Sequence, residues 1–205
     1  MKINYADFKK ELDAHFSTES HLVTECLIRY WFIKAHSAKA EIEVPYRVLP
    51  IKPTKNYLEY KRARVDLYYG NTEDAVFEFK YHRRTKYSDC CTATNMGKVF
   101  NDLNRLSIID KAEKYFIYVF DENMKKYYEK HSPFDILKMS KVKADEKLNV
   151  DGAIDKLLAD GYAEFKKQAF SGFTVNEFKD FDYTIEVKRV ETLSDNYNLL
   201  IFKIL

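Results

Sequence analysis

The stretch from Arg62 to Arg84, RARVDLYYGNTEDAVFEFKYHRR, decides the fold that this sequence predicts. Two segments in it, Arg64–Tyr69 and residues 75–81, are rich in β-branched and aromatic side chains and are expected to form β-strands. Gly70 and Asn71 begin a turn-prone connection between them. The stretch therefore predicts a β-hairpin in the first half of the chain.

Side chains alternate between the two faces of a strand, which sorts the residues of this hairpin by face. In the first strand, Val65, Leu67 and Tyr69 share one face, and Arg64, Asp66 and Tyr68 share the other. In the second strand, Val76, Glu78 and Lys80 share one face, and Phe77, Phe79 and Tyr81 share the other.

The loop length sets the expected register of the hairpin. A symmetric loop over residues 70–74 places Tyr69 opposite Ala75, and the same register places Asp66 opposite Glu78. Directly opposed residues point to one face with Cβ atoms about 5 Å apart, so two carboxylates in these positions repel each other.

A divalent cation between the two carboxylates would reverse that repulsion, because hard ions such as Mg²⁺ prefer carboxylate oxygens and water as ligands. Lys80 lies two residues after Glu78, opposite Arg64, and is expected to point at the same place. The alternative is a surface hairpin with one solvated face, held by cross-strand ion pairs worth roughly a few tenths of a kcal/mol.

The pattern of Asp66 followed by Glu78-Phe79-Lys80 across a hairpin resembles the PD-(D/E)xK nuclease superfamily, which has the restriction-endonuclease-like fold. Val65 stands where the family often has a proline. The resemblance implies a Mg²⁺-dependent nuclease, with Mn²⁺ as a possible substitute. Asp66 and Glu78 would hold the metal, and Lys80 would be catalytic, by orienting or deprotonating water or by stabilising charge on the phosphate.

Hydrophobic periodicity predicts the remaining elements. Helices are expected over residues 5–16, 21–38, 96–109, 122–130 and 153–169. Further strands are expected over 41–49, near a sheet edge or a bulge because of Pro45, and over 115–120, which is apolar enough to be buried on both faces. Residues 138–152 are expected to form a polar connection, and residues 183–190 and 199–204 a second hairpin around Ser194-Asp195-Asn196.

From the second helix on, the expected order is helix, strand, strand, strand, helix, strand, which is the αβββαβ order of the PD-(D/E)xK core. We therefore expect a single α/β domain over residues 1–205, with a central mixed β-sheet flanked by helices. The resemblance covers about residues 20–121. Residues 122–205 would extend this core with a C-terminal helix and hairpin.

Glu25 lies in the first helix of that core. In the family this helix often carries a glutamate that faces the metal, so the resemblance implies a catalytic and metal-binding role for Glu25. Glu19, just before the helix, is a second candidate. Alternatively, Glu25 is an ordinary exposed residue that pairs with Arg29 at i+4.

Six residues are candidate contacts to a nucleic-acid backbone: Arg83, Arg84, Lys86, Lys98, Asn101 and Arg105. The first three follow the strand that carries Glu78, where positive charge would suit a phosphodiester. The last three lie along one side of the following helix. The alternative is a solvated face in which Asp102 pairs with Lys98 at i+4.

Composition narrows the function further. A net charge of only +2 means that nucleic-acid binding must come from a local basic surface. No apolar run reaches the roughly 18 residues of a membrane span. The three cysteines, Cys26, Cys90 and Cys91, form no disulfide framework and fit the reducing cytoplasm. The histidine spacing argues against zinc, and no P-loop or nucleophile elbow is present.

The expected function is Mg²⁺-dependent hydrolysis of phosphodiesters, with DNA as the favoured substrate and RNA left open. Cutting of both DNA strands would suit a homodimer. The alternative is a non-catalytic nucleic-acid-binding or regulatory module on the same fold, although such a module gains nothing from carboxylates facing phosphates. A protein-interaction domain, suggested by the aromatic content, ranks last. Restriction, repair, mobile-element and toxin nucleases remain open.

Overall fold

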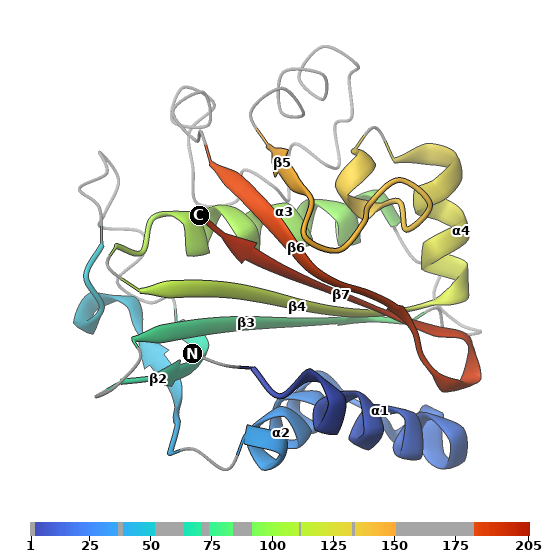
Figure 1. Cartoon of the computed structure of the whole chain (residues 1–205), viewed down its shortest axis with the longest axis horizontal. Coiled ribbons are helices and arrows are strands. Elements are labelled where there is room, and N and C mark those ends of the chain that lie inside the picture. The colour runs from blue at the N-terminus through green and yellow to red at the C-terminus, as the bar shows by residue number, and fades with distance from the viewer. Residues whose placement is uncertain are drawn as a thin grey trace.

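A seven-stranded mixed β-sheet runs through the protein, and helices cover both of its faces (Figure 1). The computed structural model describes residues 3–36, 39–51, 64–70, 74–83, 92–110, 112–132, 134–150 and 183–205. The architecture confirms the expected α/β class with a central mixed sheet flanked by helices. None of the described helices is long and apolar enough to cross a membrane.

Four α-helices are described: α1 (Tyr5–Glu19), α2 (Glu25–His36), α3 (Thr92–Ser107) and α4 (Glu122–His131). The strands are β1 (Glu41–Pro45), β2 (Arg64–Tyr69), β3 (Ala75–His82), β4 (Glu113–Asp121), β5 (Lys147–Asn149), β6 (Thr184–Thr192) and β7 (Tyr197–Ile204). Short 3-10 turns are Ser20–Leu22, Tyr46–Val48, Asp135–Leu137 and Ser194–Asn196.

The strands lie in the order β1-β2-β3-β4-β7-β6-β5. Only β3 and β4 are parallel neighbours, and α3 connects them. The second hairpin, β6 and β7, forms as expected and joins the same sheet, because β7 pairs with β4 along its whole length. The predicted edge position of the strand around Pro45 is also confirmed, since β1 is the first strand of the sheet.

Two hydrophobic cores fill the space between the sheet and its helices. The α3-side core lies between the sheet and α3 with α4, and the α1-side core lies between the sheet and α1 with α2 (Figure 1). Residues of β4 alternate between them: Phe116, Tyr118 and Phe120 face the α3-side core, and Tyr115, Ile117 and Val119 face the α1-side core. This confirms the prediction of a strand buried on both faces.

Several element boundaries differ from those expected; α3, for example, is Thr92–Ser107 rather than 96–109. Helix α2 begins only at Glu25, because a 3-10 turn precedes it and the Thr24 hydroxyl accepts a hydrogen bond from the amide of Leu27 at 3.3 Å, which caps the helix. Strand β1 ends at Pro45, which lacks the amide that continued pairing needs. The connection expected over 138–152 contains the short strand β5, whereas the helix expected over 153–169 lies outside the described residues.

Candidate functional site

The hairpin of β2 and β3 has the register predicted from its loop, with Tyr69 opposite Ala75. Regular pairing ends two residues further along, before Asp66 and Glu78 are reached. Asp66 and Glu78 were predicted to be directly opposed across the two strands, and so were Arg64 and Lys80. Both predictions are wrong, because neither pair belongs to the regular β2–β3 pairing.

The side chains of β2 change faces around Asp66, at the level where its pairing with β3 stops. In the neighbouring strand β1, Glu43 stands across from Asp66 with a left-handed φ of 55°, and these two residues are skipped in the β1–β2 pairing. As a result Val65 faces the α3-side core, whereas Leu67 and Tyr69 face the α1-side core. The prediction that all three share one face is wrong.

Beyond this point β2 and β3 separate, and we call the opening between them the fork. Within the described residues, no strand pairs with this edge of β3, and two carboxylates accept hydrogen bonds from its amides instead. The amide of Phe79 donates to Asp66 Oδ2 at 2.7 Å, and the amide of Tyr81 donates to Glu25 Oε2 at 3.1 Å. Asp66 and Glu25 thus reach the fork from β2 and from the first turn of α2.

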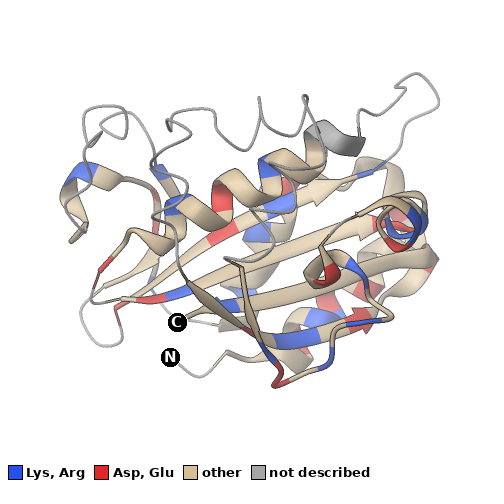
Figure 2. Ribbon diagram, turned by 90° about the horizontal axis from the view of Figure 1, so that it is seen from above, with Lys and Arg blue, Asp and Glu red and all other residues tan. Residues whose placement is uncertain are grey.

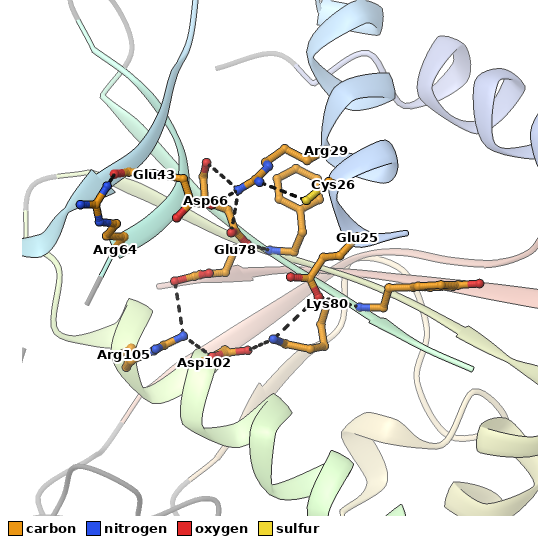
Figure 3. A network of polar contacts seen from close by, with 12 residues as sticks. Glu25, Cys26, Arg29, Glu43, Arg64, Asp66, Glu78, Lys80, Asp102 and Arg105 are labelled. Atoms are coloured by element: carbon orange, nitrogen blue, oxygen red, sulfur yellow. Dashed lines mark hydrogen bonds and ion pairs between the residues drawn. The ribbon is translucent and has the colours of Figure 1, made fainter. Parts of the chain in front are cut away.

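Glu78 and Lys80 share the face of β3 that is turned toward α3, as the alternation predicted. Lys80 Nζ lies 2.7 Å from Asp102 Oδ2 and 3.8 Å from Glu25 Oε2. Arg105 Nη2 lies 3.8 Å from Glu78 Oε1 and also hydrogen-bonds to Asp102 (Figure 3). Residues from β3, α2 and α3 therefore meet at the fork.

Arg29 enters the fork from α2. Its Nη1 lies 2.9 Å from Asp66 Oδ1 and 2.6 Å from Glu43 Oε1 (Figure 3). The alternative prediction that Arg29 pairs with Glu25 is wrong, because Glu25 turns toward Lys80 and the Tyr81 amide instead. Glu19 ends α1 and makes no described contact with these residues.

Four carboxylates and three cations thus meet at the fork: Glu25, Asp66, Glu78 and Asp102 with Arg29, Lys80 and Arg105. If every group is ionised, one negative charge has no positive counterpart. Glu43, at the solvent-exposed rim, adds another carboxylate.

Comparison of the chain with family models, curated proteins and solved structures found no match.

Glu78 is the most buried carboxylate of the set. It is 4% exposed, and its Oε1 has no hydrogen-bond partner among the described residues. Burial raises the pKa of Glu78 well above its ordinary value, Arg105 opposes the shift, and Asp66 adds to it. Burial also raises the pKa of Asp66, against the amide of Phe79 and the charge of Arg29. The two carboxyl groups lie within hydrogen-bonding reach of each other.

Lys80 remains protonated at neutral pH. Burial lowers the pKa of its ammonium, but Asp102 and Glu25 outweigh this effect and raise the pKa above the ordinary value. The pKa of His82, two residues later in β3, shifts in the opposite direction, because burial lowers it to about 3. The Nδ1 of His82 lies 2.9 Å from the hydroxyl of Tyr118. Lys80 is therefore the positive charge that β3 contributes to the fork.

The fork differs from a ready-made metal cage. Within the described residues, no group of three or more His, Cys, Asp and Glu side chains lies close enough to hold a metal ion. Asp66 and Glu78 nevertheless fit a divalent cation whose remaining ligands are water, because they adjoin each other and include a buried oxygen without a described hydrogen bond.

The candidate nucleic-acid contacts that fall within the described residues have different surroundings. Arg83 donates to the carbonyl oxygens of Ser20 and His21, which ties the end of β3 to the turn before α2. Arg84 and Lys86 lie outside the described residues. In the described part of the chain, basic and acidic residues are interspersed along the helices and strands (Figure 2).

On α3, the three candidates have different surroundings. Lys98 is exposed, Asn101 is partly buried with an Oδ1 that lacks a described hydrogen-bond partner, and Arg105 belongs to the fork. Asp102 pairs with Lys80 and Arg105, so its predicted pairing with Lys98 is wrong. Asp102 and Arg29 are the residues of the fork to which the sequence analysis gave no role in the site.

Proposed function

We propose that this protein is a Mg²⁺-dependent nuclease, with Mn²⁺ as a substitute, that hydrolyses phosphodiester bonds in DNA at the fork. One observation carries the proposal: Asp66, Glu78 and Lys80 meet at the fork, where Glu78 has a buried carboxylate oxygen without a described hydrogen bond. The element order α2, β1, β2, β3, α3, β4 supports the resemblance to the PD-(D/E)xK superfamily.

Asp66 and Glu78 would hold the ion. Asp66 Oδ2 is occupied by the Phe79 amide, which leaves Oδ1 as the ligand, and Glu78 offers its Oε1. A bound divalent ion supplies Lewis acidity that polarises the phosphate and lowers the pKa of a coordinated water. Glu25 is more exposed than Asp66 and Glu78, and it would accept a hydrogen bond from water at the mouth of the fork.

Lys80 would stabilise negative charge on the phosphate as the water attacks. Its raised pKa makes it a poor general base at neutral pH, whereas a fixed ammonium beside the reacting phosphate lowers the energy of the transition state. Asp102 would orient Lys80 through their 2.7 Å contact. Lys98, which is exposed on the same helix, would contact the nucleic-acid backbone, and a homodimer would bring two forks to the two strands.

Cleavage of plasmid DNA, DNA oligonucleotides and RNA oligonucleotides with Mg²⁺ or Mn²⁺ tests the proposal. We expect the wild type to cleave DNA, and Asp66→Asn and Glu78→Gln to lose cleavage but still bind DNA in EDTA. Asp135→Asn is the control, because Asp135 is exposed and pairs only with Lys138. Cleavage that survives in both fork variants would refute the mechanism. Binding without cleavage in the wild type would favour a non-catalytic nucleic-acid-binding or regulatory module.

A further inference from the structure

Arg29 uses only one edge of its guanidinium group at the fork. Its Nη1 donates to Asp66 Oδ1 at 2.9 Å and to Glu43 Oε1 at 2.6 Å, and lies 3.4 Å from the carbonyl oxygen of Asp66. In the described part of the chain, Nη2 makes a single weak contact of 3.6 Å with Cys26 Sγ (Figure 3). A guanidinium group has five N–H donors arranged to bind oxyanions, so several of these donors are available.

The contact of Arg29 with Asp66 places a positive charge at the carboxylate that a divalent ion would bind. Both oxygens of Asp66 accept a hydrogen bond, Oδ2 from the amide of Phe79 and Oδ1 from Arg29, so an ion that binds Asp66 lies close to the guanidinium. Two cations at one carboxylate oxygen repel each other, so binding of the ion favours departure of the guanidinium from Asp66.

A displaced Arg29 would keep only a weak partner. Glu43 has a side chain that is 47% exposed, and an ion pair in such contact with water contributes little. The guanidinium would therefore be free to turn its available donors toward an oxyanion beside the ion, and a phosphodiester provides such an oxyanion.

We propose that Arg29 is an internal counter-ion of Asp66 that a divalent cation displaces, and that the released guanidinium then binds the phosphate of the substrate. This inference rests on the proposed nuclease function. It makes cation binding and phosphate binding mutually dependent through one side chain, because Arg29 reaches the phosphate only after the cation has replaced it at Asp66.

Mn²⁺ titration by calorimetry without nucleic acid tests the first half of the proposal. We expect Arg29→Gln to bind Mn²⁺ about tenfold more tightly than the wild type, because a competing positive charge is gone. Arg29→Lys keeps the charge and should stay close to the wild type. Arg64→Gln is the matched control and should leave the affinity unchanged, because among the described residues Arg64 hydrogen-bonds only to the carbonyl oxygen of Glu43, at 3.2 Å.

DNA binding in Ca²⁺ and in EDTA tests the second half, with a short duplex and Ca²⁺ as an ion that supports little or no cleavage. The wild type should bind the duplex more tightly in Ca²⁺. We expect that gain to be smaller by about fivefold or more in Arg29→Gln, which is the low end for coupled sites. An undiminished gain would overturn the phosphate role of Arg29.

The outcomes separate this inference from the proposed function. Equal or weaker Mn²⁺ binding by Arg29→Gln, with binding by the wild type intact, overturns the counter-ion role alone. Tighter Mn²⁺ binding without DNA cleavage by the wild type supports the counter-ion role and overturns the nuclease. Absence of Mn²⁺ binding in every protein overturns both. If Arg29→Gln is unfolded in EDTA, Mn²⁺ should restore its folding, and failure to do so overturns the role.

Discussion

Lys80 Nζ lies 2.7 Å from Asp102 Oδ2, and the two side chains are only 19% and 5% exposed. The pair joins the middle of β3 to α3 and stands beside the Asp102 contact with Arg105. Removing Asp102 would leave two largely buried cations without their nearest carboxylate.

Asp102→Ala should therefore lower the free energy of unfolding by about 3 kcal/mol, the scale for removing one partner of a buried ion pair. Urea unfolding in EDTA measures this. Asp135→Ala is the control, because its carboxylate is 65% exposed and its pair with Lys138 is worth less than about 1 kcal/mol. A small loss in both variants would mean that Lys80 and Arg105 find other carboxylates in the fork.

Glu78 should make stability fall as the pH rises. Burial raises its pKa above the ordinary value of 4.5, so the folded protein holds this proton more tightly than the unfolded chain does. The resulting stability is complete below the unfolded pKa and is lost as the pH rises through the folded pKa. In EDTA, Glu78→Gln should therefore be more stable than the wild type at about pH 8, and the difference should vanish near pH 4.

Glu113 provides a control of opposite sign. Partial burial opposes ionisation of Glu113, but Lys203 outweighs it and lowers the pKa to about 2. The ionised carboxylate therefore contributes to the stability of the fold above the unfolded pKa, and this contribution is lost as the pH falls through about 2. Glu113→Gln should be less stable than the wild type at neutral pH. Unfolding curves for both variants across the pH range would contradict the assignments if the two differences had the same sign.

Lys80→Ala should slow DNA cleavage about a hundredfold at saturating metal, the usual loss for one preorganised contact to the transition state. Its KM should change little if the contact forms mainly in the transition state. Steady-state cleavage of a labelled oligonucleotide gives both constants. Lys34→Ala is the control, because Lys34 pairs with Glu11 on the protein surface. A rate within a few-fold of the wild type would remove Lys80 from the chemistry.

Lys98 and Arg105 share the side of α3 predicted to contact nucleic acid, but they should behave differently. Lys98→Ala should reduce the salt dependence of DNA binding by about one counterion and leave stability unchanged. Arg105→Ala should destabilise the fold by about 2 to 3 kcal/mol, because Glu78 and Asp102 lose a cation in a buried setting. Each variant should be measured for DNA binding across a salt series and for unfolding in urea. Equal losses of stability in Lys98→Ala and Arg105→Ala would contradict the different roles assigned to the two residues.

Much of the fold could be predicted from sequence because it follows from local patterns. Alternation located β2 and β3, the loop length gave the register at Tyr69 and Ala75, and the apolar run in β4 indicated burial on both faces. The position of β7 beside β4 could not be predicted, since pairing between strands so far apart in the chain leaves no local pattern. The three residues of β5 are too few for a periodic signal.

The site was predicted in part. Alternation placed Glu78 and Lys80 on one face of β3, and the resemblance to a nuclease family drew attention to Asp66 and Glu25. The change of face around Asp66 could not be foreseen, because nothing in the local sequence marks Glu43, which stands across from it in β1, as a left-handed residue. The contact of Lys80 with Asp102 could not be foreseen either, because a single acidic residue on a helix surface looks the same in sequence whether it faces solvent or the sheet.

The open edge of β3 links the proposed chemistry to solubility. Side chains rather than a strand accept the amides of Phe79 and Tyr81, and these amides project in one direction as they would toward a partner strand. Replacing Asp66 and Glu25 with residues that cannot accept a hydrogen bond would leave a bare edge that can recruit a strand from another molecule. Variants that lose these two carboxylates should therefore aggregate more readily during expression.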